Sequence, residues 1–151
     1  MQFTHEATVT IETPLRDVRA HWTGPDALCG RLSHIRATAP GPAADLACLV
    51  ICLDGRDLEF AVQRTMCTDE TVCWQSLGET FLYVLTVCLQ DGKTGGAQIT
   101  VTVAYDPPGF LYDIAESLGW HKGFQRDLDR DLARYARALR HQFSTAFTRV
   151  G

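Results

Sequence analysis

The sequence lacks the features that mark several large classes of protein. No apolar run is long enough to span a membrane, and Met1 to Thr10 has neither the basic start nor the apolar stretch of a signal peptide. We therefore expect a cytoplasmic protein without a membrane partner. The formal net charge is −4 at pH 7, which disfavours a nucleic-acid partner because phosphate binding needs a basic surface.

Motifs for common chemistries are also missing. No serine stands in a Gly-x-Ser-x-Gly setting, so a hydrolase triad has no support. Gly92-Lys93-Thr94 resembles the end of a phosphate-binding loop, but Val87 stands where the first glycine is needed and no helix is expected to follow. We interpret this segment as a hairpin turn.

The six cysteines form no Cys-x-x-Cys pair. Most of them lie in segments predicted to be strands, so we interpret them as reduced, small apolar residues of the interior. Cys67 and Cys73 flank a predicted turn, which leaves a disulfide or a metal site as the alternative. No histidine or further cysteine has the spacing of a zinc ligand, and we therefore expect no metal.

The composition that remains is typical of one globular domain. The chain has 151 residues, of which 46% are hydrophobic and 21% charged, and this is enough for a single core. We expect one domain over residues 1–151.

The clearest helix signal runs from Gly123 to Phe147. Apolar residues recur there at steps of three and four, which places them on one face of a helix. They are Phe124, Leu128, Leu132, Tyr135, Leu139, Phe143 and Ala146. So long an apolar face needs a partner in water, because burial supplies most of a helix's stability. The preceding chain is expected to cover it.

That preceding chain alternates apolar and polar residues in short segments, which is typical of half-buried strands. The predicted strands are 2–12, 32–38, 45–53, 57–66, 71–77, 80–90 and 98–105. Two short helices are predicted between the first two strands, capped by Thr13 and Asp26, and a linking helix around 111–118. Asp54-Gly55 is a tight hairpin signal. These elements predict an α+β fold, a curved antiparallel sheet of about seven strands wrapped on the long helix.

Such a sheet and one helix enclose more volume than the helix side chains fill, so we expect an apolar cavity. Arg64 is a charged residue on the predicted inward face of its strand, and a buried guanidinium without a partner is costly. We hypothesise that Arg64 polarises a carbonyl or holds an enolate, with Asp131 as base or orienting group. The alternatives are an internal ion pair, or an Asp131 that faces water.

Further candidates lie on the inward faces of the predicted elements. Tyr83 is the third candidate catalytic residue, and the alternative is a core tyrosine whose hydroxyl bonds to the backbone. His34 is a candidate because it follows the short helices, where a cavity mouth would form; a surface histidine is the alternative. The expected substrate-binding residues, several of which fit a plain core equally well, are Phe60, Trp74, Val101, Tyr105, Phe124, Leu128, Tyr135 and His34.

Several short segments follow one another in the order seen in one superfamily. They are Thr13-Pro14 with Val18 and Trp22, Leu32-Ser33-His34, Gly55-Arg56 to Arg64-Thr65, Trp74 to Leu77, Tyr105 to Gly109, and Asp131 to Tyr135. Together they resemble the START-like, helix-grip superfamily (SRPBCC), in particular its polyketide cyclase/dehydrase branch. The resemblance covers nearly the whole chain.

The resemblance implies a helix-grip fold and a cyclase or dehydratase of secondary metabolism, such as antibiotic biosynthesis, that needs no metal or redox cofactor. In aromatase/cyclases of the tetracenomycin type, an arginine on this strand takes part in catalysis, and Arg64 matches it. A tyrosine at the cavity mouth and an asparagine on the last helix are also implicated there, and Ile35 and Asp131 occupy those positions here. The resemblance further implies a polyketide-like substrate that arrives on an acyl carrier protein.

Two other functions remain open from the sequence. One is a carrier or binding protein for a small hydrophobic ligand, in which Arg64 anchors a polar head. The other is a subunit of a larger assembly, because the strand at 45–53 is apolar on both faces and its outer face is a candidate homodimer contact.

Overall fold

A computed structural model describes residues 2–53, 55–78, 81–92, 95–106 and 120–150, without the side chains of 120–121 and 141–150. Its elements, in chain order, are β1 (Phe3–Ile11), α1 (Leu15–Thr23), α2 (Pro25–Cys29), β2 (Ile35–Pro40), β3 (Leu46–Leu53), β4 (Arg56–Cys67), β5 (Thr71–Ser76), β6 (Leu82–Asp91), β7 (Ala97–Asp106) and α4 (Trp120–Val150). The linking helix predicted around 111–118 lies outside the described residues. No helix within the described ranges combines the length and the apolarity needed to cross a membrane.

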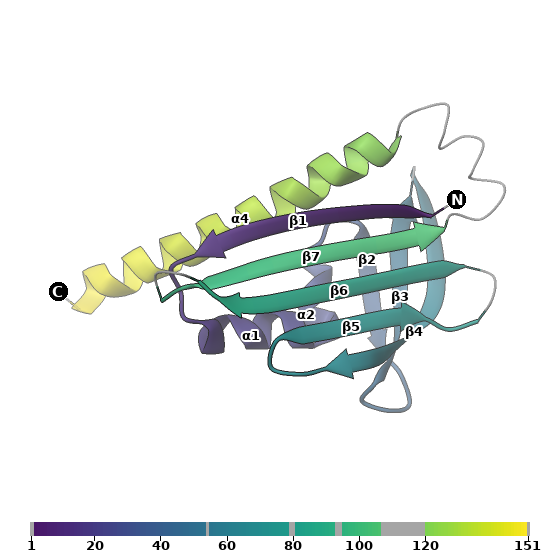
Figure 1. The fold of residues 1–151 in the computed structure, drawn as a ribbon, viewed down its shortest axis with the longest axis horizontal. Helices are drawn as coiled ribbons and strands as arrows, with labels where there is room; N and C mark the ends of the chain where they lie inside the picture. Colours follow the sequence, from purple (N-terminus) through teal and green to yellow (C-terminus); the bar gives the residue numbers. More distant parts are fainter. Residues whose placement is uncertain (1, 54, 79–80, 93–94, 107–119, 151) are drawn as a thin grey trace.

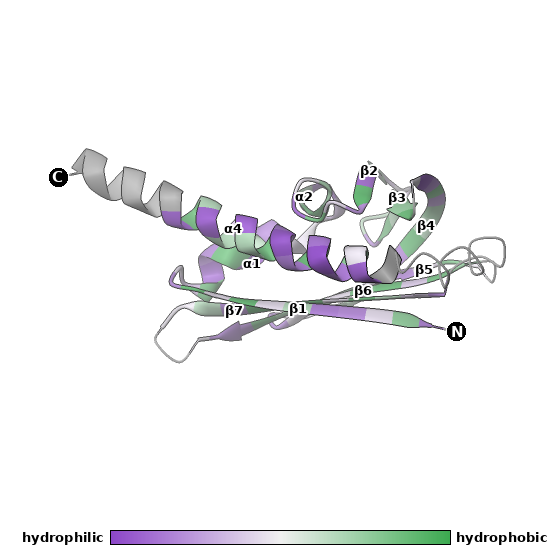
Figure 2. Cartoon of the chain, turned by 90° about the horizontal axis from the view of Figure 1, so that it is seen from above, coloured by the Kyte–Doolittle hydropathy of each residue, from purple (hydrophilic) through white to green (hydrophobic). Residues whose placement is uncertain are grey.

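The strands form one seven-stranded antiparallel sheet in the order β1-β7-β6-β5-β4-β3-β2. In Figure 1, β1, β7, β6 and β5 lie side by side, and β2, β3 and β4 turn behind them at one end. Figure 2 shows α4 running along one face of the sheet, with α2 also on that side. The predicted fold, a curved antiparallel sheet around a long C-terminal helix with two short helices between the first two strands, is confirmed.

The core lies between the concave face of the sheet and the helices. Alternate residues of β6 and β7 point inward, as period two requires, and are completely buried. They are Tyr83, Leu85, Val87, Leu89, Ile99, Val101, Val103 and Tyr105. Leu128 and Leu132 of α4 and Trp22 of α1 belong to the same buried cluster. The apolar face of α4, which the sequence analysis expected to need a partner, is thus buried against this core.

The predicted helix caps are wrong in both short helices. Pro14 occupies the N-cap position of α1 and Gly24 that of α2, and neither helix has a side-chain cap hydrogen bond. Thr13 therefore lies one residue too early to cap α1. Asp26 lies inside α2, where its Oδ1 accepts a hydrogen bond from the hydroxyl of Thr38 at 3.0 Å. This contact ties α2 to β2.

In β4, the alternation of inward and outward side chains shifts by one residue at a point where the sequence pattern continues unbroken. The pairing of β4 with β5 is irregular between Arg64 and Met66, because an extra residue there interrupts the ladder. Arg64 stays on the inward face opposite the buried Trp74, whereas the side chain of Met66 turns outward and is 49% exposed. The inward position predicted for Met66 is therefore wrong.

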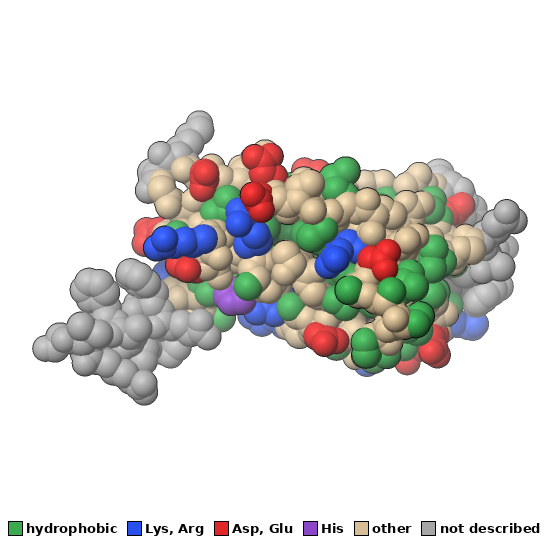
Figure 3. Space-filling view, turned by 90° about the horizontal axis from the view of Figure 1, so that it is seen from below, with side chains coloured by type: hydrophobic (Ala, Val, Ile, Leu, Met, Phe, Trp, Pro, Cys, Tyr) green, Lys and Arg blue, Asp and Glu red, His purple; other side chains and the backbone are tan. Residues whose placement is uncertain are grey.

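The interpretation of the cysteines as interior residues is also wrong. All six are free, five are half-buried and Cys67 is exposed. Those in the strands mostly occupy outward positions; Cys48, for example, lies between the buried Ala47 and Leu49. The outer face of β3 also presents the half-buried Val50. In Figure 3, hydrophobic side chains gather toward the end of the molecule where β3 and β4 lie. A dimer contact there stays a prediction.

The inward and outward faces of β6 should differ sharply in their tolerance of truncation. Leu85→Ala removes methyl groups from a fully buried site and should lower the free energy of unfolding by about 2–5 kcal/mol. Thr86→Ala, on the outer face of the same strand, should change it by no more than about 0.5 kcal/mol. Urea denaturation of both variants measures the difference, and similar losses would contradict the assigned faces.

Candidate functional site

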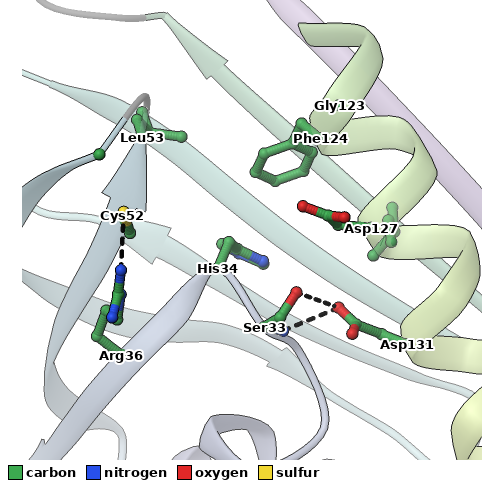
Figure 4. A pocket seen from close by; sticks show the side chains of 11 residues that line it. Ser33, His34, Arg36, Cys52, Leu53, Gly123, Phe124, Asp127 and Asp131 are labelled. Carbon is green, nitrogen blue, oxygen red and sulfur yellow. Dashed lines mark hydrogen bonds between the residues drawn. The ribbon is translucent and has the colours of Figure 1, made fainter. Parts of the chain in front are cut away.

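A pocket of about 460 Å³ opens between the first half of α4 and the strands β2 and β3. This volume lies within the range of small-molecule sites. The sheet side contributes Ser33, His34, Arg36, Cys52, Leu53 and Gly55, and α4 contributes Gly123, Phe124, Asp127, Leu128 and Asp131. Figure 4 shows how these side chains face one another across the pocket.

His34 provides a buried polar group on the pocket wall. Its Nε2 lies 2.7 Å from the hydroxyl oxygen of Tyr83, on the inward face of β6. Burial lowers the pKa of His34 from 6.5 to about 3, with a further contribution from nearby His5, because a charged imidazole would lose its hydration. Burial raises the pKa of Tyr83 for the corresponding reason. At neutral pH the pair is an uncharged imidazole bonded to a protonated phenol.

A second histidine–tyrosine pair lies next to the first. His5 Nε2 is 3.0 Å from the hydroxyl of Tyr105, and Tyr105 lies directly opposite Tyr83 in the register of β6 with β7. The ring of Phe124 lies over both histidines, with centroid distances of 4.7 Å to His5 and 4.9 Å to His34. This end of the core therefore places two histidine–tyrosine pairs against one phenylalanine ring.

Asp131 lines the same pocket and is only 4% exposed. Its Oδ2 accepts hydrogen bonds from the backbone N–H of Ser33 at 2.8 Å and from the Ser33 hydroxyl at 2.9 Å. Its Oδ1 lies 3.2 Å from the guanidinium of Arg134. The described contacts thus join Asp131 to Ser33 and Arg134, and no ion pair between Asp131 and Arg64 occurs among them.

Arg64 occupies a different part of the concave face. Its guanidinium carbon lies 5.7 Å from the centroid of the Trp74 ring, and the residue is half-buried. It is not one of the residues that line the pocket beside α4. The catalytic role expected for Arg64 stays a prediction, and the pocket chemistry has to be derived from other residues.

The remaining predicted residues divide between pocket and core. His34, Phe124, Leu128 and Asp131 line the pocket, and Tyr83 lies directly behind His34. The other predicted binding residues lie elsewhere in the packed interior. Phe60 packs against Tyr83 at 5.2 Å, Val101 is fully buried, and the hydroxyl of Tyr135 lies 2.7 Å from His21 Nδ1.

Sequence reasoning missed several residues of the pocket, including Ser33, Arg36, Cys52 and Asp127. One available signal was helical spacing, since Asp127 precedes Asp131 by four residues and so shares its side of α4. Ser33 and Cys52 had no comparable signal, because only the pairing of distant segments brings them together.

A second pocket of about 520 Å³ lies between the end of β1 and the later turns of α4. Its lining residues are Thr10, Ile11, Glu12, Thr13, Ala136, Leu139 and Arg140, none of which was predicted as a site residue. Over the described part of the chain, no group of three or more histidine, cysteine or acidic side chains is arranged to hold a metal ion.

Comparison with known proteins identifies the fold. The sequence matches no protein-family model and no curated protein. Among solved structures, a protein from Deinococcus radiodurans is similar with a TM-score of 0.72 and 18% identity, over 89% of this chain and 95% of that one. A START superfamily protein from Mycobacterium smegmatis has a TM-score of 0.57 and 10% identity, over 87% and 98%.

A third similar structure is the di-domain ARO/CYC protein StfQ of the steffimycin biosynthetic pathway. It has a TM-score of 0.66 and 11% identity, over 96% of this chain and 53% of that chain. Together with the topology, these similarities show that the chain has the START-like helix-grip fold of the SRPBCC proteins.

The buried histidine predicts a pH dependence of stability. As the pH falls below about 6.5, the unfolded chain protonates His34 while the folded chain keeps it neutral until about pH 3. The unfolded state then binds more protons, so His34 lowers the free energy of unfolding by at most about 1.4 kcal/mol per pH unit in this window. Denaturant titrations from pH 7.5 to 4.5 should show a steeper loss for the wild type than for His34→Gln. Parallel curves would contradict the neutral, buried state.

Proposed function

We propose that the protein is a cyclase or dehydratase that acts on a polyketide-like, carbonyl-rich substrate in the pocket beside α4. The observation that carries the proposal is the uncharged His34–Tyr83 pair at the wall of a pocket of small-molecule size. The similarity of the fold to that of an ARO/CYC protein supports the same class of chemistry.

The pair is suited to bind a carbonyl oxygen. If the phenol of Tyr83, which retains its proton, donates to Nε2 of His34, the imidazole proton resides on Nδ1. An Nδ1–H group can then donate to a substrate carbonyl and stabilise the negative charge that develops on its oxygen when an enolate forms. A neutral donor in a buried site is effective because little water competes for the oxygen.

Proton removal is assigned to Asp127. Figure 4 shows its carboxylate on the α4 side of the pocket, across from His34. It accepts the proton from the carbon next to the bound carbonyl, and the resulting enolate carbon then attacks a second carbonyl carbon of the same chain. The π bond of that carbonyl opens to an alkoxide, which takes the proton back from Asp127 and becomes an alcohol. Holding the two carbons close together contributes several kcal/mol, on the order of what intramolecular reactions gain. Asp127 then removes a second proton from the carbon next to the carbonyl, the hydroxyl group leaves with a proton as water, and a carbon–carbon double bond forms.

The substrate is proposed to arrive as a thioester on an acyl carrier protein and to enter where the pocket opens to solvent. The apolar side chains of Leu53, Phe124 and Leu128 provide the surface for its carbon chain. No metal or redox cofactor takes part in this scheme.

A ligand carrier is the second candidate function, and one observation favours it. The pKa of about 3 makes His34 a weak base, so the pair can recognise a ligand oxygen without promoting turnover. In that case the same pocket would hold a small apolar ligand and release it unchanged.

A reconstituted polyketide synthase separates the two functions. Addition of the wild-type protein should redirect the product mixture to one ring pattern, as measured by liquid chromatography and mass spectrometry. His34→Ala and Asp127→Asn should each slow formation of that product by on the order of 100-fold. If the mixture is the same with and without the protein, while a small molecule co-purifies with it, the carrier function is the correct one.

Arg64→Ala tests the hypothesis drawn from the sequence in the same assay. Arg64 does not line the pocket, so this variant should retain the wild-type ring pattern if catalysis occurs beside His34. Loss of turnover in Arg64→Ala together with full activity of His34→Ala would assign catalysis to the Arg64 region and contradict the proposed site.

A further inference from the structure

The segment between α2 and β2 carries His34 and is hydrogen-bonded to α4. Residue 33, immediately before His34, donates two hydrogen bonds to Asp131 Oδ2, from its backbone N–H at 2.8 Å and from its hydroxyl at 2.9 Å. Figure 4 shows both bonds spanning from this segment to the helix. These two hydrogen bonds join Ser33 to the α4 side of the pocket.

Asp131 is fully engaged in holding this segment. It is 4% exposed, and its second oxygen lies 3.2 Å from the guanidinium of Arg134, which also donates to the backbone carbonyl of Arg31 at 3.5 Å. Hydrogen bonds to a carboxylate are roughly twice as strong as those between neutral groups. A carboxylate with donors on both oxygens is better suited to fix its partners than to accept a proton from a substrate.

His34 is fixed from two other directions as well. Its backbone carbonyl accepts a hydrogen bond from the N–H of Cys52 on β3 at 2.8 Å, and its ring is held by the hydroxyl of Tyr83 on β6. The Ser33–Asp131 contact adds the connection to α4. Two contacts therefore set the place of the imidazole relative to the sheet. Its place relative to α4 is set by the Ser33–Asp131 hydrogen bonds together with the ring contact to Phe124 at 4.9 Å.

We infer that Asp131 is a positioning residue, which acts through Ser33 to hold the imidazole of His34 at a constant distance and angle from the α4 wall of the pocket. The expected effect on the reaction rate rests on the proposed function. In that function Asp127 and His34, which lie on opposite walls of the pocket, act on the same substrate. A displacement of about 1 Å between such groups can cost on the order of 100-fold in rate.

The geometry of the His34 ring is the direct test, and it needs no substrate. In the wild type, the ¹⁵N and ¹H resonances of the His34 ring should show one tautomer with a hydrogen bond to Tyr83. Asp131→Ala should shift these resonances and broaden them into more than one state. Asp26→Ala is the matched control, since it removes an exposed contact between α2 and β2 and should leave the ring signals unchanged.

Two milder variants keep the test valid if Asp131→Ala does not fold. Ser33→Ala loses the hydroxyl bond but keeps the backbone N–H donor, so it should shift the His34 signals less than Asp131→Ala. Asp131→Asn keeps an acceptor oxygen for Ser33 and should restore most of the wild-type spectrum. Wild-type His34 signals in both Asp131→Ala and Ser33→Ala, or in Ser33→Ala alone if only that variant folds, would overturn the inference.

Kinetic measurements then separate this inference from the proposed function. With the reconstituted synthase, Asp131→Ala should lower kcat by on the order of 10-fold to 100-fold with a smaller change in KM. Displaced His34 signals together with a wild-type protein that never alters the product mixture would uphold the positioning role and reject the cyclase function. A lowered kcat with unchanged His34 signals would reject the positioning role and leave the cyclase function standing.

Discussion

Burial of the apolar face of α4 against the concave sheet is the constraint on which the rest of the structure depends. Leu128 and Leu132 are each 1% exposed, and they pack over strands whose inward residues are completely buried. At the end where β2, β3 and β4 turn toward the α4 side of the sheet, side chains leave a space between α4 and the strands β2 and β3. The pocket occupies that end.

The chemistry of the pocket follows from what this packing does to ionisable groups. A histidine and a tyrosine that face each other away from water both remain uncharged, and their shared hydrogen bond offsets part of the cost of burial. Asp131 is buried in the same region. Its burial is tolerated because two donors from Ser33 and one from Arg134 form hydrogen bonds to its oxygens. The site therefore places the uncharged His34–Tyr83 pair opposite the hydrogen-bonded carboxyl group of Asp131.

The START-like fold does not select one activity by itself, since a cavity under a helix serves binding and catalysis equally well. The activity therefore has to be argued from the set of side chains that the pocket brings together. The arginine on β4 stacks on Trp74 away from that pocket, so the chemistry proposed here is centred on His34.

The sequence by itself determined the elements and their faces, because period two in β6 and β7 and the three- and four-residue steps of α4 are local properties of a chain that must bury apolar surface. It also placed His34, Phe124, Leu128 and Asp131 among the candidates. Only the tertiary structure decided which candidates meet. It decided the bulge after Arg64 and the exposure of the cysteines. It also made the contacts of Ser33 with Asp131 and of His34 with Tyr83, which join residues far apart in the chain. Such contacts depend on how the sheet curves around the helix, which no local pattern encodes.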